Sequence, residues 1–271
     1  MFNLNYIVMK QLFLLAVMVI VFVSCEDNNN SHESANGNTI EQTGGDNTID
    51  TTQIIAFQDP IAKVICTLYW DLNKDGELSY SEAGVVTDIL SVFKDSSITT
   101  FNELKYFTRL TAIGESAFDG CIRLKSLTIP DGVTSIGEKA FSGCSSLTGV
   151  TIPDSVTSIE NSAFYGCSSL TSVTIPDSVT TIGDEAFKDC RSLTSVTIPD
   201  SVTTIGGSAF YNCRSLTSVY CKAITPPAGG SYMFAFNASG RKIYVPMESV
   251  EAYKSASYWS SYKNDIVGYD F

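Results

Sequence analysis

The stretch SSLTGVTIPDSVTSIENSAFYGC, residues 145–167, returns almost unchanged as RSLTSVTIPDSVTTIGGSAFYNC at residues 191–213. Self-similarity at a fixed period of about 20 to 50 residues is the signature of a solenoid. A solenoid offers broad surfaces, so the repeat favours binding over catalysis. The register is marked by five cysteines that stand 23 residues apart, Cys121, Cys144, Cys167, Cys190 and Cys213.

Each repeat follows the pattern LxxVxIPxxVxxIGxxAFxxC. Val173 and Ile175 alternate with polar residues, which predicts a strand with one buried face. Pro176 ends that strand, and a second extended segment carries Val179 and Ile182. One repeat cannot bury its apolar edge alone, but stacked repeats form a continuous core. The core column most easily recognised in the sequence comprises Phe118, Phe141, Phe164, Phe187 and Phe210.

A second column is glycine in four of five coils, where we expect an unusual backbone conformation. Its members are Gly114, Gly137, Gly183 and Gly206, with Glu160 in the remaining coil.

The signature IPxxVxxIGxxAFxxC resembles that of the BspA-like leucine-rich repeats of bacterial surface proteins, from about Phe101 to the C-terminus. The resemblance implies an α/β solenoid, right-handed, with a parallel β-sheet on its concave face. It also implies display outside the cell for adhesion or host interaction. The order of a calcium-type loop at residues 71–82, a capping segment, the repeats and a terminal cap is similar to that of lipoproteins in this family.

The equally spaced cysteines allow two interpretations. In an exported protein, cysteines usually indicate disulfides. Equivalent positions on adjacent coils lie about 4.8 Å apart, however, and five stacked cysteines cannot all pair. The register therefore favours small buried thiols, and we expect Cys66 and Cys221 to be buried as well. Without histidines at matching spacing, the column is also a poor zinc site.

The N-terminus is predicted to be a targeting segment. Lys10 precedes an apolar run, 12–23, that is short for a membrane span and typical of a signal peptide, with Met1 or Met9 as the start. The sequence ending at Cys25 resembles a bacterial lipobox, which implies lipidation of Cys25; an ordinary cleaved signal and an uncleaved anchor are the alternatives. Glu26-Asp27 resembles the acidic signal that sends such lipoproteins to the cell surface.

The domain organisation follows from these features. Residues 1–24 form the signal peptide, and 25–53 a polar, disordered tether. Residues 54–90 form an EF-hand-like calcium-binding segment, 91–221 the leucine-rich-repeat solenoid and 222–271 the C-terminal cap.

Residues 71–82, DLNKDGELSYSE, match the EF-hand loop at each diagnostic position. Gly76 permits the sharp turn at loop position 6, and Glu77 offers its backbone carbonyl. The alternative is an Asp- and Gly-rich turn without metal. A lone loop outside the cell predicts weak calcium affinity, with a dissociation constant on the order of 10⁻⁴–10⁻³ M, and a role in rigidifying the N-terminal cap. The predicted calcium ligands are Asp71, Asn73, Asp75, Glu77, Ser79 (through water) and Glu82.

The flanking segments carry helix signals. Asp59 and Pro60 are a plausible helix start, followed by an apolar face that includes Leu68 and Tyr69. Thr100 and Glu103 predict a capping box before a short helix, Phe101–Phe107. Near the C-terminus we expect a strand, Lys242–Val245, a helix, Glu248–Ala256, and three aromatic residues that seal the last coil, Trp259, Tyr262 and Tyr269.

Two polar columns are predicted to face solvent. The first lines the concave sheet with hydroxyl groups and is either a recognition surface or a soluble, β-favouring face. It comprises Thr128, Thr151, Thr174, Thr197 and Tyr220. The second is an acidic row at the turns, more typical of turn formation than of cation binding. It comprises Asp131, Asp154, Asp177 and Asp200.

Composition restricts the function. The net charge of −12 argues against nucleic-acid binding and leaves the N-terminal lipid as the only membrane contact. The single histidine, His32, removes most histidine-based catalysis and zinc chemistry, so we predict no enzyme. The leading hypothesis is an outer-membrane lipoprotein, exposed on the cell surface, that binds an extracellular protein or glycan. The alternative is a structural spacer that assembles end to end or along an edge.

Overall fold

A computed structural model of the protein describes residues 53–271. The predicted signal peptide, the lipidation site Cys25 and nearly all of the predicted tether lie outside these residues and stay predictions. Over the described part of the chain, no helix combines the length and the apolar character needed to cross a bilayer.

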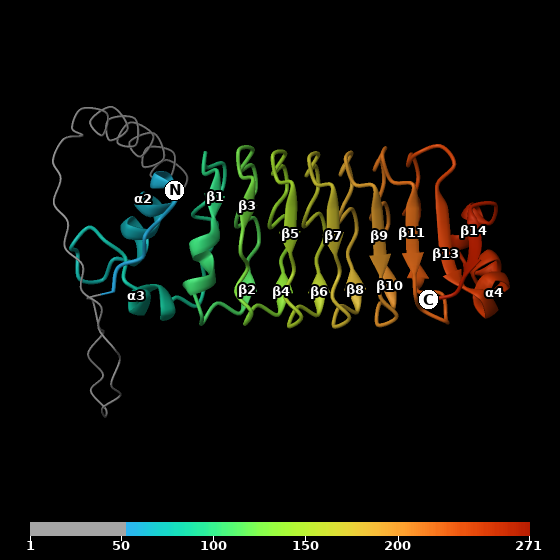
Figure 1. Ribbon diagram of the computed structural model, residues 1–271, viewed down its shortest axis with the longest axis horizontal. Coiled ribbons are helices and arrows are strands. Elements are labelled where there is room, and N and C mark those ends of the chain that lie inside the picture. The colour runs from blue at the N-terminus through green and yellow to red at the C-terminus, as the bar shows by residue number, and fades with distance from the viewer. Residues whose placement is uncertain (1–52) are drawn as a thin grey trace, which may run out of the picture. The chain divides into compact units, whose positions relative to one another are not determined.

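The repeats form a solenoid in which successive coils lie side by side (Figure 1). Each regular coil contributes one strand to each of two parallel sheets, in register with its neighbours: Thr174 lies opposite Thr197, and Thr181 opposite Thr204. The long-strand sheet confirms the predicted strand. The second extended segment, predicted without a partner, forms a sheet of its own.

The long-strand sheet has the order β14-β13-β11-β9-β7-β5. Its strands are β5 (Gly149–Thr151), β7 (Ser172–Thr174), β9 (Ser195–Ile198), β11 (Ser218–Cys221), β13 (Lys242–Pro246) and β14 (Ile266–Tyr269). The short-strand sheet has the order β12-β10-β8-β6-β4-β2. Its strands are β2 (Ala112–Ile113), β4 (Ser135–Ile136), β6 (Ser158–Ile159), β8 (Thr181–Ile182), β10 (Thr204–Ile205) and β12 (Ala228–Gly229). A separate pair joins β1 (Thr100–Phe101) to β3 (Ser126–Leu127).

Phenylalanine side chains form a stacked spine through the core. The rings of Phe141 and Phe164 lie 5.2 Å apart, centroid to centroid, at an angle of 10°. The predicted column is thus confirmed, and it extends one coil further at each end, to Phe93 and Phe234. Stacked rings of this kind bury large apolar area and add a favourable pair energy.

The cysteines are free thiols in the core, as the register favoured. All seven in residues 53–271 are buried and unpaired. The thiol of Cys144 donates a hydrogen bond to the carbonyl oxygen of Phe118 in the preceding coil (Sγ–O 3.2 Å), and Cys190 bonds Phe164 in the same way. The thiols therefore link neighbouring coils through single hydrogen bonds rather than covalent bonds.

The glycine column does not have the unusual backbone conformation predicted for it. Positive φ falls on other residues, among them Gly143, immediately before the cysteine column. Glycine is needed at Gly206 for a different reason, since a Cβ atom there would lie 2.4 Å from the backbone nitrogen of Asp184. At Gly137, Gly183 and Gly206 the column thus marks close approach of adjacent coils, whereas a Cβ atom at Gly114 would have room.

At the N-terminal end, α2 (Pro60–Trp70) begins where predicted. Asp59 caps it by accepting hydrogen bonds from the backbone N–H groups of Ile61 and Ala62. The predicted apolar face is wrong in part, because Leu68 and Tyr69 are 60% and 55% exposed. Ile65, which belongs to the predicted face, is buried as expected, together with Ala62 and Cys66.

The predicted capping box at Thr100 and Glu103 is wrong. The segment is a short 3₁₀ helix, η1 (Asn102–Tyr106), without a side-chain cap, and the Thr100 hydroxyl has no partner among the described residues. Glu103 instead accepts a hydrogen bond from the backbone N–H of Gln58. This contact joins the segment before α2 to the start of the solenoid.

At the C-terminal end, η2 (Met247–Ser249), α4 (Val250–Ser255) and η3 (Trp259–Tyr262) follow β13. Trp259 is fully buried, and its indole N–H donates to the carbonyl of Pro227. Tyr262 accepts a hydrogen bond from the backbone N–H of Phe234. Tyr269, predicted to seal the coil as well, is 42% exposed on the outward side of β14, so that expectation is wrong.

Candidate functional site

The loop 71–82 is closed by hydrogen bonds from its own acidic side chains. The two carboxylate oxygens of Asp71 accept the backbone N–H groups of Lys74 and Gly76. Glu82, which is buried, reaches back to the start of the loop, and its Oε1 accepts the N–H groups of Leu72 and Asn73. The first and last predicted ligands thus hold the two ends of the loop together.

Other predicted ligands have additional roles. The capping box of α3 (Tyr80–Gly84) is formed by Ser79 and Glu82, and the Ser79 hydroxyl donates to Oε2 of Glu82. The side chain of Glu77 forms an ion pair with Lys63 (Oε1–Nζ 2.6 Å). The predicted calcium ligand at this residue is the backbone carbonyl oxygen of Glu77. A ligand role for Ser79 through water stays a prediction.

The donor chemistry of this loop fits calcium, because every side chain offered is a hard oxygen donor. Gly76 has a φ of +85°, the left-handed conformation that the sharp turn requires. The loop carboxylates are nonetheless occupied with backbone N–H groups. Across residues 53–271, no three His, Cys, Asp or Glu side chains are grouped as a metal centre. The loop therefore suits calcium in two respects, the oxygen atoms that its side chains offer and the closed conformation of its backbone.

A short segment before α2, Gln53–Ile55, pairs with this loop, and this pairing was not predicted from the sequence. Ile54 forms an antiparallel bridge with Ser79. The N–H of Ile55 donates to the carbonyl of Leu78 (2.8 Å), and the N–H of Tyr80 to the carbonyl of Gln53 (3.0 Å). Ile55 and Leu78 are both buried. The single loop therefore has a pairing strand from within its own chain.

Asp59 connects α2 to the solenoid. Its Oδ2 accepts hydrogen bonds from the N–H and the hydroxyl of Thr99, at 2.6 and 2.7 Å. Burial alone would raise the pKa of Asp59, but the bonds from Thr99, Ala62 and Ile61 outweigh it and hold the pKa below its ordinary value. The ionised carboxylate therefore fixes the N-terminal segment, through α2, to the first coils.

The second candidate site is the outward side of the long-strand sheet. Thr151, Thr174 and Thr197 lie opposite one another on adjacent strands, all exposed, and half-buried Tyr220 continues the column. Thr128 is exposed but follows β3, and its hydroxyl faces Asn102 (3.4 Å). We call the outward side chains of this sheet the hydroxyl face: Thr151, Thr174 and Thr197 with Ser172, Ser195 and Ser218.

The predicted acidic row lies at the turns. Asp131, Asp154, Asp177 and Asp200 are all exposed, and none of them forms an ion pair with another residue of the described chain. They therefore present an unneutralised row, spaced by one coil.

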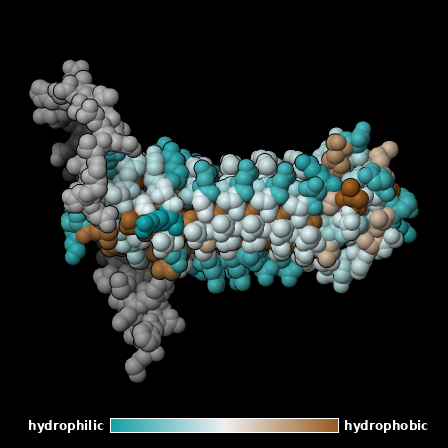
Figure 2. All heavy atoms as spheres, turned by 90° about the horizontal axis from the view of Figure 1, so that it is seen from below, coloured by the Kyte–Doolittle hydropathy of each residue, from teal (hydrophilic) through white to brown (hydrophobic). Residues whose placement is uncertain are grey.

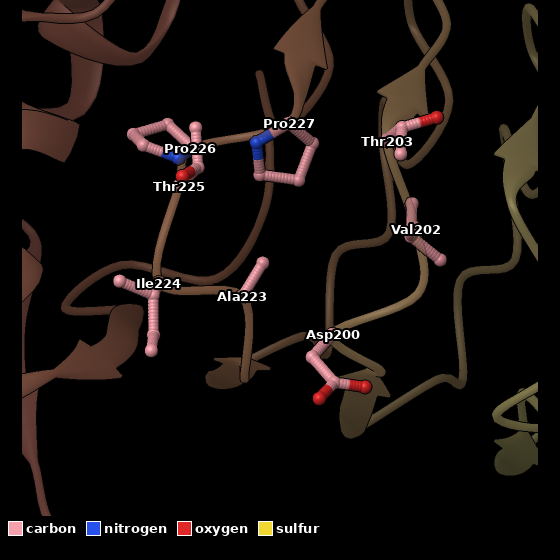
Figure 3. A pocket seen from close by; sticks show the side chains of 8 residues that line it. All are labelled: Asp200, Val202, Thr203, Ala223, Ile224, Thr225, Pro226 and Pro227. Carbon is pink, nitrogen blue, oxygen red and sulfur yellow. The ribbon is translucent and has the colours of Figure 1, made fainter.

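A pocket of about 400 Å³ opens where the regular repeat ends (Figure 3). Asp200 and Ile224 stand on opposite sides of its rim, with Pro226 and Pro227 at the far end. It forms because the loop after β11 replaces the regular turn. The lining residues are Asp200, Val202, Thr203, Ala223, Ile224, Thr225, Pro226 and Pro227.

Comparison with known families decides the identity of the repeats. The model described as "BspA type Leucine rich repeat region (6 copies)" matches residues 90–217 and 158–264, more than half of the chain. The chain belongs to the BspA-type leucine-rich repeat family. As a member of this family, it has the fold of a leucine-rich-repeat solenoid, and such repeat proteins are generally non-enzymatic.

Solved structures similar to this family member are bacterial proteins. A leucine-rich repeat protein of T. pallidum is 38% identical over 41% of this chain and 52% of its own (TM-score 0.41). A leucine rich cell surface protein of Faecalibacterium prausnitzii A2-165 is 36% identical over 44% and 38% (TM-score 0.36). The pneumococcal vaccine antigen PcpA is 21% identical over 65% and 42% (TM-score 0.48). The chain spans about half or less of each, and no curated protein matches it.

An aromatic cluster at the end of the hydroxyl face of this BspA-type chain was not predicted from the sequence. The repeat register places Tyr220 in the threonine column, but it does not place Tyr244, Tyr269 and Phe271 beside it. Their connection depends on the pairing of β11, β13 and β14, which follows the last regular repeat. Tyr220, the aromatic residue in the Thr column, is the sequence signal that could have indicated the cluster.

Proposed function

We propose that this protein is a lipid-anchored module of the bacterial cell surface that binds an extracellular protein or glycan through its hydroxyl face. The observation that carries the proposal is the alignment of Thr151, Thr174 and Thr197 on three adjacent paired strands. Each hydroxyl can donate and accept a hydrogen bond, and all three side chains are exposed. The inward residues supply the core, so the outward column is free to serve recognition.

Anchoring rests on the N-terminal sequence. Lipidation of Cys25 after removal of residues 1–24, with a tether over 25–53, would hold the solenoid at the outer membrane and expose it to the outside. Metabolic labelling with a fatty acid tests this proposal. The wild-type protein should take up the label, and the Cys25→Ala variant should not. Degradation of the anchored protein by protease added to intact cells would support surface exposure.

Calcium is proposed to stabilise the N-terminal end. Asp71, Asn73, Asp75, the Glu77 carbonyl and Glu82 would hold the ion, whose positive charge would balance the loop carboxylates. The pairing of Gln53–Ile55 with this loop and the bond from Asp59 to Thr99 support a role in fixing the segment to the solenoid.

The segments outside the repeats are proposed to act as caps, 54–90 as an EF-hand-like cap and 222–271 as the C-terminal one. Trp70 lies against Phe93 and Phe107 near the first coils, and Trp259 lies 5.8 Å from Phe234 at the end of the spine. A solenoid needs such covers, because its terminal coils would otherwise expose core residues.

The binding proposal is tested by probing arrays of host matrix proteins and of glycans with the full-length protein, with calcium and with chelator. Saturable binding to one class of ligand is expected. The absence of binding on both arrays in both conditions would contradict the proposed function.

A second candidate function is self-association, supported by one observation at the C-terminal end. Tyr232 and Phe236 have positive φ and are 66% and 68% exposed. The preceding coil has Ser208 and Asn212 with the same positive φ. Large exposed aromatic residues in a strained conformation contribute little to folding, so they indicate a contact surface. Sedimentation of the wild type and of a Tyr232→Ser, Phe236→Asn variant tests this: an oligomer lost in the variant would favour the spacer.

A further inference from the structure

Exposed apolar side chains are concentrated at the two ends of the solenoid. Between residues 123 and 223, Tyr165 is the one large hydrophobic residue that is exposed, whereas several are exposed beyond Met247. Figure 2 shows brown spheres at both ends on one face, with a mainly pale or teal surface and only narrow brown strips between them. The C-terminal group includes Tyr269, which lies on the same side of the long-strand sheet as the hydroxyl face.

The column that is threonine in β5, β7 and β9 becomes aromatic in the next two strands. Tyr220 pairs with Tyr244 across β11 and β13, and their rings stack 4.7 Å apart at 13°. Tyr269 lies edge-on to both, at 5.6 and 5.4 Å, and Phe271 lies edge-on to Tyr269 at 5.0 Å. Tyr269 and Phe271 are 42% and 51% exposed. Two rings at a steep angle thus form an exposed aromatic corner.

The phenol groups of this corner are available to a ligand. No hydrogen bond within the described residues engages the hydroxyls of Tyr220, Tyr244 or Tyr269. Tyrosine combines an apolar ring with a polar tip, which suits surfaces that meet a partner having both characters. The corner therefore continues the hydroxyl face while adding apolar area.

Two exposed lysines lie on this side of the sheet; of the carboxylates close by in sequence, Asp265 pairs with Arg241, and Asp270, between Tyr269 and Phe271, is exposed. Lys242 lies two residues before Tyr244 on the same side of β13, and it is the one charged residue among the outward positions of the six long strands. Lys222, immediately after β11, is also exposed. Neither lysine forms an ion pair within the described chain. In a protein of net charge −12, two exposed lysines without a carboxylate partner favour an anionic group.

We infer that the hydroxyl face and its aromatic corner bind a glycan polymer that carries anionic groups, with the sugar rings packed on Tyr269 and Phe271 and an anionic group paired with Lys242. The inference rests on the proposed binding function and names its ligand class. A hydroxyl-rich polymer matches a face that both donates and accepts hydrogen bonds. The carboxylate or sulfate group supplies the partner for Lys242.

The observations favour a glycan over a peptide. Inside the sheet each strand is paired on both sides, so a peptide backbone lying across the face would find few free N–H or C=O groups there. A nucleic acid is disfavoured by the net charge and by the presence of a single lysine within the sheet face.

The test measures binding of the full-length protein to three immobilised polymers: polygalacturonate, dextran sulfate and neutral dextran. Binding to polygalacturonate, to dextran sulfate or to both is expected, with no binding to dextran, and the two charged polymers distinguish a carboxylate from a sulfate. Lys242→Ser and Tyr269→Ser should each weaken binding roughly tenfold. Lys105→Ser removes the same charge from an exposed residue of η1, at the other end of the repeats, and should have no effect.

Thermal melting of each variant separates lost contacts from lost folding. Equal binding to dextran and to the charged polymers, or unchanged binding in both Lys242→Ser and Tyr269→Ser, would overturn the inference. Binding to a matrix protein alone on the arrays would overturn it too, while leaving the proposed binding function in place. Binding to nothing on the arrays would contradict the proposed function itself.

Discussion

The thiol of Cys167 lies 3.2 Å from the carbonyl oxygen of Phe141, one coil earlier, and donates a hydrogen bond to it. The same carbonyl also accepts the backbone N–H of Cys144. Each cysteine thus closes its own coil through the backbone and joins the coil before it through the side chain. This relationship explains why the cysteine column repeats with the register while forming no disulfide.

Burial determines the reactivity of these thiols. It raises the pKa of Cys167 and Cys213 to about 12 and that of Cys221 to about 11, so the reactive thiolate is scarce at neutral pH. We predict that none of the seven cysteines of residues 53–271 is alkylated by iodoacetamide at pH 8 in the folded protein. All seven should react in guanidinium, as measured by mass spectrometry. A disulfide between two of them would contradict this account.

Two adjacent glycines provide a matched test of coil packing. At Gly206 a Cβ atom would lie 2.4 Å from a backbone atom, whereas at Gly207 the nearest atoms are 3.5 Å away. Gly206→Ala should therefore reduce the free energy of unfolding by about 1–3 kcal/mol or more. Gly207→Ala should be neutral or stabilise by up to about 1 kcal/mol, because it restricts the unfolded chain. Urea unfolding measures both, and equal effects would argue against the coil spacing described above.

The buried Asp59 should make stability depend on acid. Its folded-state pKa is lower than its ordinary value of about 3.9, so its contribution is complete above that pH and is lost as the pH falls through the folded-state pKa. Asp59→Asn should cost about 1–2 kcal/mol at pH 7, and the difference from wild type should shrink below about pH 4.

Urea unfolding between pH 7 and pH 2.5 measures this difference. Asp177→Asn, an exposed turn carboxylate, is the control and should show little difference at any pH. A penalty for Asp59→Asn that stays constant down to the lowest pH would show that the charge of Asp59 is not what joins α2 to the solenoid.

Calcium should raise the melting temperature of the full-length protein. At a free concentration of 100 times the dissociation constant, a ligand that binds only the folded state stabilises it by about 2.7 kcal/mol. Asp75→Asn removes one carboxylate while keeping an oxygen that can accept the Glu77 N–H, so it should abolish most of the calcium effect with little change in chelator. Asp177→Asn should leave the effect intact. Identical melting curves in calcium and chelator for wild type would disprove calcium binding.

The repeat determined how much could be predicted from the sequence. Side-chain alternation is enough to predict the strand through Val173. The 23-residue period is enough to predict the Phe164 column and the buried Cys167, because every coil repeats it. The glycine column was placed correctly but explained wrongly, because a close approach between coils is a tertiary distance that no local pattern encodes.

The ends were harder to predict because each contact there occurs once. Thr100 and Glu103 satisfy the spacing of a capping box, but Glu103 bonds Gln58, which lies 45 residues earlier in the chain. Tyr269 was expected in the core, yet the pairing of β14 places it outside. The loop 71–82 was visible as a motif, whereas its pairing with Ile54 could not be inferred from composition.

The measurement that tests the central claim most directly is array binding of two variants that each place an arginine on a sheet face. Thr174→Arg obstructs the middle of the hydroxyl face, whereas Thr204→Arg makes the same change at an exposed threonine of the short-strand sheet. The account predicts that Thr174→Arg weakens binding to the ligand found on the arrays by roughly tenfold or more, and that Thr204→Arg binds like wild type. Equal binding by both variants, with melting temperatures unchanged, would show that the hydroxyl face is not the recognition surface.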